Sequence, residues 1–244
     1  MQTAIKYQII HDELKAEILD GKYRPGDTFP SEPELQTRFD ASRVTIRRSV
    51  QMLVDEGFLK RMQGVGTVVI SDKQTLQLKN LVSFADENKS RKTSSVVVMS
   101  DPAMEASPLV CSQLNITPGS KVACQEKVRV GEGVPLGFQR VYVPSTIGLT
   151  DKELSLPEVS LYESLSAKGH AVYKAEETIE AALCDDRLAD LLKIQSGTPL
   201  LYVQRITEDR IGTRVEYAEI YYRGDQYHYR IQLQAPDADA VPEG

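Results

Sequence analysis

The residues of this chain best suited to chemistry lie between positions 42 and 53, where side chains that can form hydrogen bonds gather on one side of a predicted helix. Ile46, Val50 and Leu53 recur at spacings of four and three, which predicts a helix that turns this apolar stripe inward. Ser42 precedes the helix as a suitable N-cap. The opposite side is then expected to present Arg43, Val44, Thr45, Arg47 and Arg48. Arginine, hydroxyl and methyl groups on one helix face suit the major groove, which offers acceptors and methyl contacts.

Two further elements position this helix. Ser31 and Glu34 stand three residues apart, which is the spacing of a capping box, and Pro33 falls in the first turn of a second predicted helix. After the recognition helix, residues 58–62 and 67–70 are expected to form two strands. Gly64 and Gly66 lie between these strands and allow positive φ angles and a close approach of the main chain. The order predicts a helix-turn-helix followed by a wing.

At these residues the chain resembles a known family. The segments YRPGDTFPSEPEL, SRVTIRRSV and EGFLKRMQGVGTVV are similar, in order and spacing, to the winged helix of GntR-type transcription regulators, over about residues 4 to 70. The resemblance implies that Arg43 and Arg47 contact bases or phosphates. It also implies that Thr45 touches the DNA backbone, that Gly66 sits near the minor groove, and that double-stranded DNA is the partner.

One position departs from the family pattern. The family usually carries an arginine where this chain has Pro33, so that contact is lost or moved, and Arg38 is the candidate replacement. The alternative for the whole region is a winged helix that contacts only protein, with its arginines as a solvated face. Residues 1–73 hold eleven basic and eleven acidic residues, so the total charge of this region does not decide between DNA and protein as its partner. The local cluster of arginines on one helix favours DNA.

The composition limits the possible ligands and the possible location of the protein. The net charge is −6, and because the first 73 residues are neutral, the other 171 carry all of it. Three scattered cysteines and three scattered histidines give no disulfide framework and no metal-ligand spacing, so we expect neither a metal nor a cofactor. No apolar run approaches ~18 residues and the N-terminus is polar, which predicts a cytoplasmic protein without a membrane segment.

The chain is long enough for two domains. We expect a DNA-binding domain at 1–72, a linker at 73–80, an effector-binding and dimerisation domain at 81–236, and a flexible tail at 237–244. In the second domain, strand patterns do not alternate regularly with helix patterns. The predicted fold class is therefore α+β with a mainly antiparallel sheet.

A hairpin in the second domain has a polar side. Residues 122–130 and 136–143 are expected to pair around Gly131–Gly133. The even positions are mostly apolar, whereas Gln125, Lys127, Arg129 and Gln139 occupy odd positions and should share the other face. Two cations beside two amides could bind a phosphate or a carboxylate on a hydroxylated body. The alternative is an ordinary solvent-facing sheet surface.

A second resemblance involves the same hairpin. KVRVGEGVPLGFQRVYVP, SLYESL and VEYAEIYYRGDQYHY are similar to the UTRA effector domain of HutC-type GntR regulators, which resembles the chorismate-lyase fold, over about residues 78 to 235. The resemblance implies that Lys127, Arg129, Ser160 and Tyr162 hold an anionic group, often a sugar phosphate. It implies that the rest of the site is lined by Gln139, Glu216 and Tyr222.

Each of these residues also has a structural interpretation. Lys127 replaces a common arginine, and Gln139 replaces a common glutamate, which favours an effector with a neutral body. Tyr162 and Tyr222 could be aromatics at the edge of the core, and Ser160 is a natural N-cap for a helix at 161–168. Glu216 could form an ion pair with Arg214 or Arg205.

Together these features predict a ligand-responsive transcription regulator, most simply a repressor of a carbohydrate operon. A homodimer would bind a pseudo-palindromic operator, and the small molecule would change its DNA affinity. An enzyme is the competing hypothesis, since the second domain resembles a lyase, but the chain shows no nucleophile–base pair. A constitutive dimeric DNA-binding protein without an effector is the third.

Overall fold

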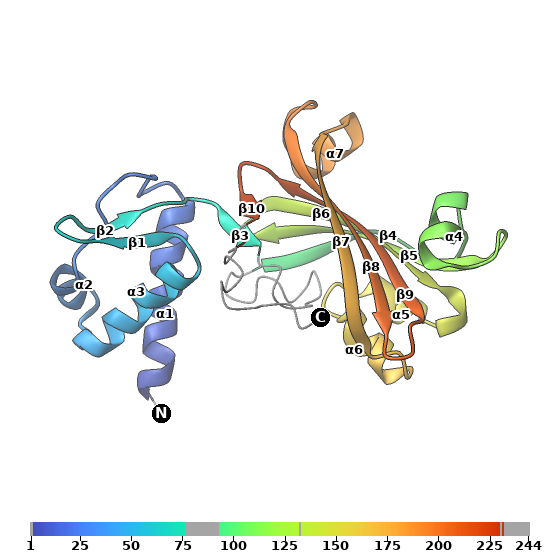
Figure 1. Ribbon diagram of the computed structural model, residues 1–244, viewed down its shortest axis with the longest axis horizontal. Coiled ribbons are helices and arrows are strands. Elements are labelled where there is room, and N and C mark those ends of the chain that lie inside the picture. The colour runs from blue at the N-terminus through green and yellow to red at the C-terminus, as the bar shows by residue number, and fades with distance from the viewer. Residues whose placement is uncertain (1, 77–92, 132, 230, 232–244) are drawn as a thin grey trace, which may run out of the picture.

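The structure is a computed structural model of the 244-residue chain, and it describes residues 2–76, 93–131, 133–229 and 231 (Figure 1). Residues 77–80 of the predicted linker, the first part of the predicted second domain and the predicted tail at 237–244 lie outside the described residues. The described residues form a small helical part with a two-stranded hairpin and a larger part built on one curved sheet (Figure 1).

The N-terminal part contains the predicted helix-turn-helix and wing hairpin, and a long helix precedes them. Its elements are α1 (Gln2–Leu19), α2 (Glu32–Phe39), α3 (Arg43–Asp55), β1 (Leu59–Met62) and β2 (Gly66–Val69). The apolar stripe predicted for α3 packs against α1 and the wing, because each of its residues falls on the same side of a 3.6-residue helix. The resulting core contains Ile10, Leu14, Ile18, Phe29, Leu35, Ile46, Val50, Leu53, Phe58, Leu59 and Val69.

Capping residues delimit the two helices of the helix-turn-helix. Ser31 and Glu34 form the predicted capping box at the start of α2, with a proline in the first turn. Asp40 ends α2 in the left-handed conformation, with φ at 43°. Ser42 then accepts a hydrogen bond from the amide of Thr45, 3.3 Å away, and starts α3. The turn is short because one helix ends and the next begins within three residues.

The C-terminal part is an antiparallel six-stranded sheet with short helices, which confirms the predicted α+β class. The strand order is β4–β5–β6–β9–β8–β7. The strands are β4 (Thr93–Glu105), β5 (Lys121–Gly131), β6 (Val134–Pro144), β7 (Val172–Leu183), β8 (Pro199–Asp209) and β9 (Arg214–Arg223). The connections contain α4 (Pro108–Leu114), the 3-10 turn η1 (Ser145–Ile147), α5 (Asp151–Ser155), α6 (Leu161–Ala167) and α7 (Asp186–Leu192).

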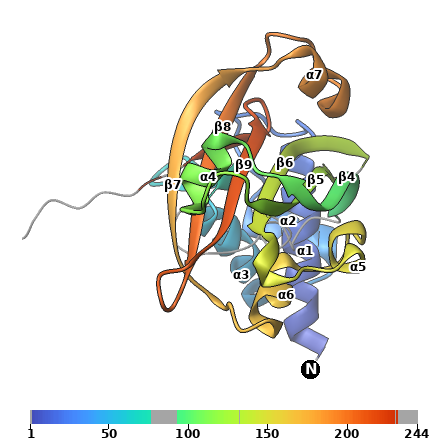
Figure 2. The same cartoon turned by 90° about the vertical axis from the view of Figure 1, so that its right-hand side faces the viewer.

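Helices lie on both faces of this sheet (Figures 1 and 2). Leu154 of α5 and Leu165 of α6 pack on one face, called here the α5/α6 face. Cys111 of α4 and Leu188 of α7 pack on the other, called the α4/α7 face. Side chains alternate between the faces along each strand, so the parity of a residue number decides which helices a side chain meets.

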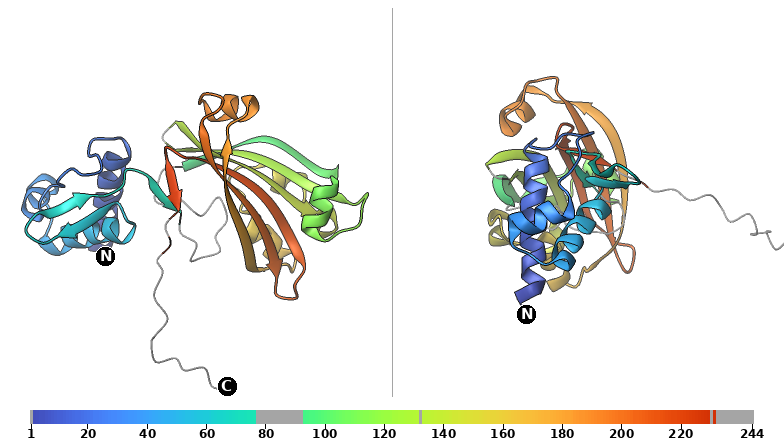
Figure 3. Two further views of the ribbon diagram at one scale, coloured as in Figure 1. Left: turned by 45° about the horizontal axis from the view of Figure 1, so that its top comes forward. Right: turned by 90° about the vertical axis from the view of Figure 1, so that its left-hand side faces the viewer.

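A short parallel pair connects the two parts. Strand β3 (Gln74–Leu76) continues from the wing and pairs in parallel with β10 (Tyr227–Tyr229), which follows the end of β9 (Figure 3). Lys73 Nζ also donates a hydrogen bond to the carbonyl of Gly224, at 2.7 Å. The sequence pattern predicted a linker here, but it did not indicate the strand partner, which is about 150 residues away along the chain.

Candidate DNA interface and anion site

Helix α3 presents an exposed, cationic surface. The side chain of Arg43 is 74% exposed, and its Nε lies 3.4 Å from Glu32 Oε2. Val44 is 77% exposed, and Arg47 is also exposed. These three residues lie in the first turns of the helix, where a recognition helix meets base edges and phosphates. The predicted surface is therefore present at Arg43, Val44 and Arg47.

Thr45 differs from the prediction. It was expected on the exposed face, but it is 5% exposed, and its hydroxyl lies 2.8 Å from Ser42 Oγ. The inward face of α3 is wider than the apolar stripe, because Ser49 is also buried and donates to the carbonyl of Tyr7 in α1, at 2.7 Å. Hydroxyl residues on that side serve the packing of α3 against α1, which hydrophobic spacing alone does not reveal.

Two of the predicted DNA-contacting arginines are engaged within the domain. The guanidinium of Arg38 forms ion pairs with Glu17 and Glu13 of α1, with Nη2 at 3.1 Å from Glu13 Oε1. Arg48 is exposed, but its guanidinium lies over the ring of Tyr7, 3.8 Å from the centroid. Either residue would have to exchange these partners for DNA. We therefore keep Arg43 and Arg47 as the principal candidates.

The tip of the wing contains both predicted glycines in a conformation that requires them. Gly64 has a φ of 77° and Gly66 a φ of 108°, and neither has an atom within 4 Å of where a Cβ would stand. The backbone conformation, and not crowding within the protein, therefore selects glycine. Lys60 and Arg61 of β1 are exposed on the same hairpin. The sequence reasoning did not single out this cationic pair, although two adjacent basic residues in a predicted wing were a usable signal for phosphate contacts.

In the C-terminal part, the sheet register brings several predicted effector residues together. Lys127 of β5 is directly opposite Gln139 of β6, and Arg129 is opposite Gly137, as the predicted alternation requires. Gly137 is in turn opposite Tyr222 of β9. A Cβ on Gly137 would lie 3.4 Å from Tyr222 Cδ1, so the tyrosine ring packs over the glycine. Lys127, Arg129, Gln139 and Tyr222 thus form one contiguous area on the α5/α6 face.

This area buries two positive charges. Lys127 is 7% exposed and Arg129 is 1% exposed, so the surface is not the solvent-facing sheet of the alternative interpretation. Among the residues that the structure describes, Lys127 forms no hydrogen bond and no ion pair; Glu158 is a carboxylate near it. Burial, with the charge of Arg129, lowers the pKa of Lys127, and Glu158 opposes this only in part. An anion placed here would compensate a charge that is costly to bury alone.

The other predicted effector residues serve a second, separate cluster. Tyr162 of α6 donates to Glu216 Oε2 at 3.0 Å, and Thr207 donates to the same oxygen at 2.6 Å. Burial raises the pKa of the Glu216 carboxyl, while Arg205 opposes this. Glu216 is six residues from Tyr222 on the same strand, which is about 20 Å. Tyr162 and Glu216 therefore belong to a separate buried network. The sequence analysis had assigned both residues to the anion site.

Ser160 and Arg205 have structural roles in the same region. Ser160 is the N-cap of α6 and accepts from the amide of Glu163, at 3.4 Å, as its structural interpretation predicted. Arg205, at 4% exposed, is a central member of the buried network and was named only as a possible partner of Glu216. It contacts Glu177, with Nε at 2.6 Å from Oε1, and Tyr162, with Nη1 at 3.3 Å from Oη. The sequence held one sign of this role: Arg205 is two positions from the apolar Val203, so the two side chains share one face of the strand.

None of the described helices is both long and apolar enough to cross a membrane. Within the described ranges, no group of three or more histidine, cysteine, aspartate or glutamate side chains is placed to hold a metal ion.

A winged helix with an arginine-bearing recognition helix, joined to an α+β domain that buries two cations, defines a two-domain transcription regulator. Residues 6–69 match the family described as bacterial regulatory proteins, gntR family, and residues 90–228 match the UTRA domain. The chain belongs to the GntR family, in the HutC-like group of DNA-binding repressors that carry a UTRA domain.

Individual relatives cover nearly the whole chain. The HTH-type transcriptional repressor NagR of Bacillus subtilis is 30% identical over 234 residues, which is 94% of this chain and 96% of the relative. The repressor PhnF of Mycolicibacterium smegmatis is 29% identical and covers 97% and 96% of the two chains. The crystal structure of PhnF from Mycobacterium smegmatis superposes with a TM-score of 0.64 at 28% identity, covering 93% of this chain and all of that one.

Proposed function

We propose that this protein is a cytoplasmic, homodimeric repressor whose affinity for a pseudo-palindromic operator is controlled by a small anionic metabolite. The relatives are repressors, and one of them is named for a mannosyl-D-glycerate transport and metabolism system. Arg43 and Arg47 of each copy enter the major groove, with the wing beside them. The metabolite binds in the UTRA domain, which is joined to the winged helix through β3 and β10.

The observation that carries the effector class is the burial of Lys127 beside Arg129. A lysine ammonium removed from water beside another cation is unfavourable unless an anion shares its surroundings. A phosphate or carboxylate meets this requirement and forms charge-assisted hydrogen bonds with both side chains. The amide of Gln139 lies opposite Lys127 and supplies a donor and an acceptor without charge, which suits hydroxyl groups. A sugar phosphate combines the two parts.

The names of the relatives do not identify the effector of this protein. Besides mannosyl-D-glycerate, they include repressors named for fructoselysine utilisation and for histidine utilisation. These three names refer to different molecules. The identity of the effector therefore has to come from the residues that surround Lys127 in this chain.

Calorimetry on the full chain tests the effector site. A sugar phosphate and its unphosphorylated parent are titrated in parallel, and we expect only the phosphorylated form to bind. Arg129→Ala should weaken binding by roughly tenfold to a hundredfold, because charge-assisted hydrogen bonds contribute about 1.5–3 kcal/mol each. Lys127→Met should act similarly, whereas Lys121→Met, at an exposed position of the same strand, should have no effect. Equal binding of both compounds would contradict the anion role.

The same preparation separates the competing functions. DNA affinity is measured on a duplex selected from a random pool by the full chain, with and without the ligand. A ligand-dependent change supports the regulator, and an unchanged affinity in the presence of bound ligand supports the constitutive DNA-binding protein. Incubation with chorismate and with sugar phosphates should give no product above the uncatalysed rate. Turnover would favour the enzyme hypothesis.

A further inference from the structure

The outward side of α3 carries an apolar residue that the fold does not use. Val44 is 77% exposed, the highest value among the large apolar side chains that the structure describes in the winged helix. It belongs to none of the hydrophobic clusters of the described residues, although α3 supplies Ile46, Val50 and Leu53 to the core. Valine is also a poorer helix former than alanine. Neither packing nor helix formation therefore accounts for a valine at this position.

Helix geometry places Val44 directly opposite the core. Leu53 follows Val44 by nine residues, which is about two and a half turns at ~3.6 residues per turn. The two side chains therefore point to opposite sides of α3. Because Leu53 is fully buried against the rest of the domain, Val44 lies at the centre of the side that faces outward.

Exposed arginines surround Val44 on this outward side. Arg47 and Arg48 are three and four residues further along α3, so both are neighbours of the valine on the helix surface, and Arg43 precedes it directly. A cationic border of this kind fits the phosphate backbone of DNA, whereas burying it against an apolar protein surface would be unfavourable. DNA is therefore the partner that would cover the valine.

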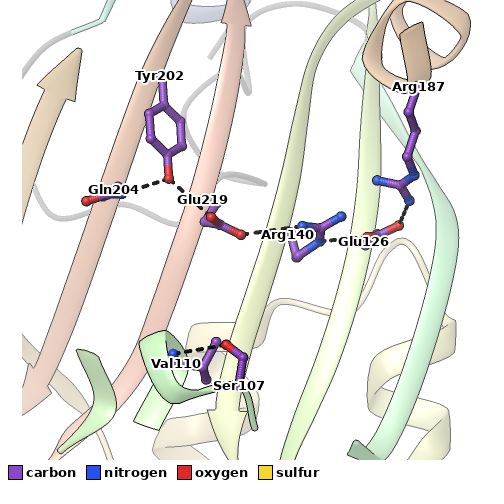
Figure 4. Close-up of polar contacts among 8 residues, drawn as sticks. All are labelled: Ser107, Val110, Glu126, Arg140, Arg187, Tyr202, Gln204 and Glu219. Atoms are coloured by element: carbon purple, nitrogen blue, oxygen red, sulfur yellow. Dashed lines mark hydrogen bonds and ion pairs between the residues drawn. The ribbon is translucent and has the colours of Figure 1, made fainter. Parts of the chain in front are cut away.

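The cations of the second domain are engaged differently. On the α4/α7 face, Arg140 Nε lies 2.7 Å from Glu126 Oε1, and Arg187 contacts the other oxygen of the same glutamate (Figure 4). Among the residues that the structure describes, the arginines of α3 form one ion pair, that of Arg43 with Glu32, at 3.4 Å. The positive charge on the outward side of α3 is therefore left largely for a partner outside the domain.

We propose that Val44 reads the 5-methyl group of a thymine in each operator half-site. The proposal rests on the DNA binding of the proposed function and names a base that the recognition helix selects. Of the four bases of DNA, only thymine presents a methyl group in the major groove, and apolar side chains contact it there. The arginines beside Val44 can bind guanine or phosphate, and neither of these contacts identifies a thymine.

The chemistry of valine also disfavours the other bases. Its side chain has no donor and no acceptor, so at a base edge it contributes only by apolar contact. An amino group of cytosine or adenine placed against Val44 would lose water without gaining an acceptor, which is unfavourable. Attraction to the methyl group and exclusion of the amino groups therefore act in the same direction.

Replacing thymine by uracil in the DNA removes only the methyl group, and this provides the test. The full chain is titrated at fixed salt against the duplex that it selects from a random pool. It is then titrated against duplexes in which one thymine of each half-site is replaced by uracil, one position at a time. One of these replacements should weaken binding about fourfold per half-site and about sixteenfold in total, the factor expected for the loss of one buried methyl group.

The same titrations with Val44→Ala assign the loss to this residue. The variant should fold normally, because Val44 is exposed and lies outside the core, and it should bind the selected duplex more weakly. The uracil replacement that weakens wild-type binding should cost the variant much less, since the contact is already lost. Ile9→Ala is the matched control, at a position of α1 that is 57% exposed, and it should keep the full uracil penalty.

Two results would overturn the role of Val44 and leave the DNA-binding function intact. One is a uracil scan in which no replacement weakens wild-type binding. The other is an equal uracil penalty in the wild type and in Val44→Ala at every position, since a valine that contacts only sugar or phosphate lowers affinity uniformly when it is removed. A full chain that selects no duplex from the pool would overturn the DNA-binding function as well.

Discussion

The guanidinium of Arg48 lies over the ring of Tyr7, 3.8 Å from its centroid, and so joins the recognition helix to α1. Arg47, one residue earlier, is exposed. Adjacent arginines on one helix therefore have different surroundings. The difference separates a residue that stabilises the winged helix from one that is available to DNA.

A comparison of Arg47→Ala and Arg48→Ala should show this division. Arg47→Ala is expected to cost ~1–3 kcal/mol of operator affinity if the side chain reads a base edge. Arg48→Ala should cost less affinity and instead lower the stability of the domain, by about 0.5–1 kcal/mol for an exposed cation–π contact. Titration of the selected duplex at fixed salt and thermal unfolding give the two quantities. An Arg47→Ala protein with unchanged affinity would refute the recognition-helix assignment.

Gly137 is expected to be intolerant of a side chain. A Cβ at this position would stand 2.9 Å from the carbonyl oxygen of Tyr221, which is a backbone atom and cannot move without separating β6 from β9. Gly137→Ala should therefore destabilise the UTRA domain by about 1–3 kcal/mol. It should also weaken anion binding, because Tyr222 packs over the glycine beside Arg129. Chemical denaturation and calorimetry measure the two effects, and an unchanged unfolding midpoint would show that the strands accommodate the methyl group.

Tyr162→Phe tests whether the second buried cluster is structural. The substitution removes the hydroxyl that donates to Glu216, and a lost hydrogen bond to a buried carboxyl should lower the free energy of unfolding by roughly 1–3 kcal/mol. Anion affinity should stay at the wild-type value, because the hydroxyl is engaged about 20 Å along the sheet from Tyr222. A large loss of anion affinity with normal stability would return Tyr162 to the anion site.

His11 should make the stability of the winged helix depend on pH. The residue is 1% exposed, and its Nε2 lies 2.8 Å from Glu56 Oε1 while its Nδ1 lies 2.8 Å from Asp12 Oδ1. Burial lowers the pKa of His11 and so does Lys15, but Glu56 and Asp12 outweigh both, and the pKa is raised overall. A raised pKa means that the folded state binds the proton more tightly than the unfolded state.

The stabilisation is then fully present below the unfolded pKa of about 6.5 and is lost as the pH rises through the folded pKa. Hydrogen exchange of α1 and α3 in the wild type and in His11→Gln, compared at each pH, isolates this contribution. The protection of the wild type should fall toward that of the variant as the pH increases above about 6.5. Parallel profiles for the two proteins would exclude a role for His11.

Much of the winged helix was predictable because its signals are local. The capping box at Ser31, the N-cap at Ser42 and the glycines of the wing act on backbone atoms within a few residues, so their spacing determines the outcome. The exposed arginines follow from the apolar stripe on the other side of α3. Thr45 was assigned to the wrong face because the buried side of α3 is wider than its apolar stripe, and no local pattern encodes that width.

In the sheet, too, some features follow from local sequence and others from the tertiary structure. Alternation along β5 and β6 determined that Lys127, Arg129 and Gln139 share one face, since the side-chain period of a strand is two. Only the tertiary structure decided that α5 and α6 cover this face, so that the cations are buried instead of solvated. The order of β9 and β8 placed Glu216 far from Arg129 and aligned Glu126, Arg140, Glu219 and Gln204 in one row. Pairing between distant strands set those neighbours, because it depends on register across the whole domain and not on any single segment.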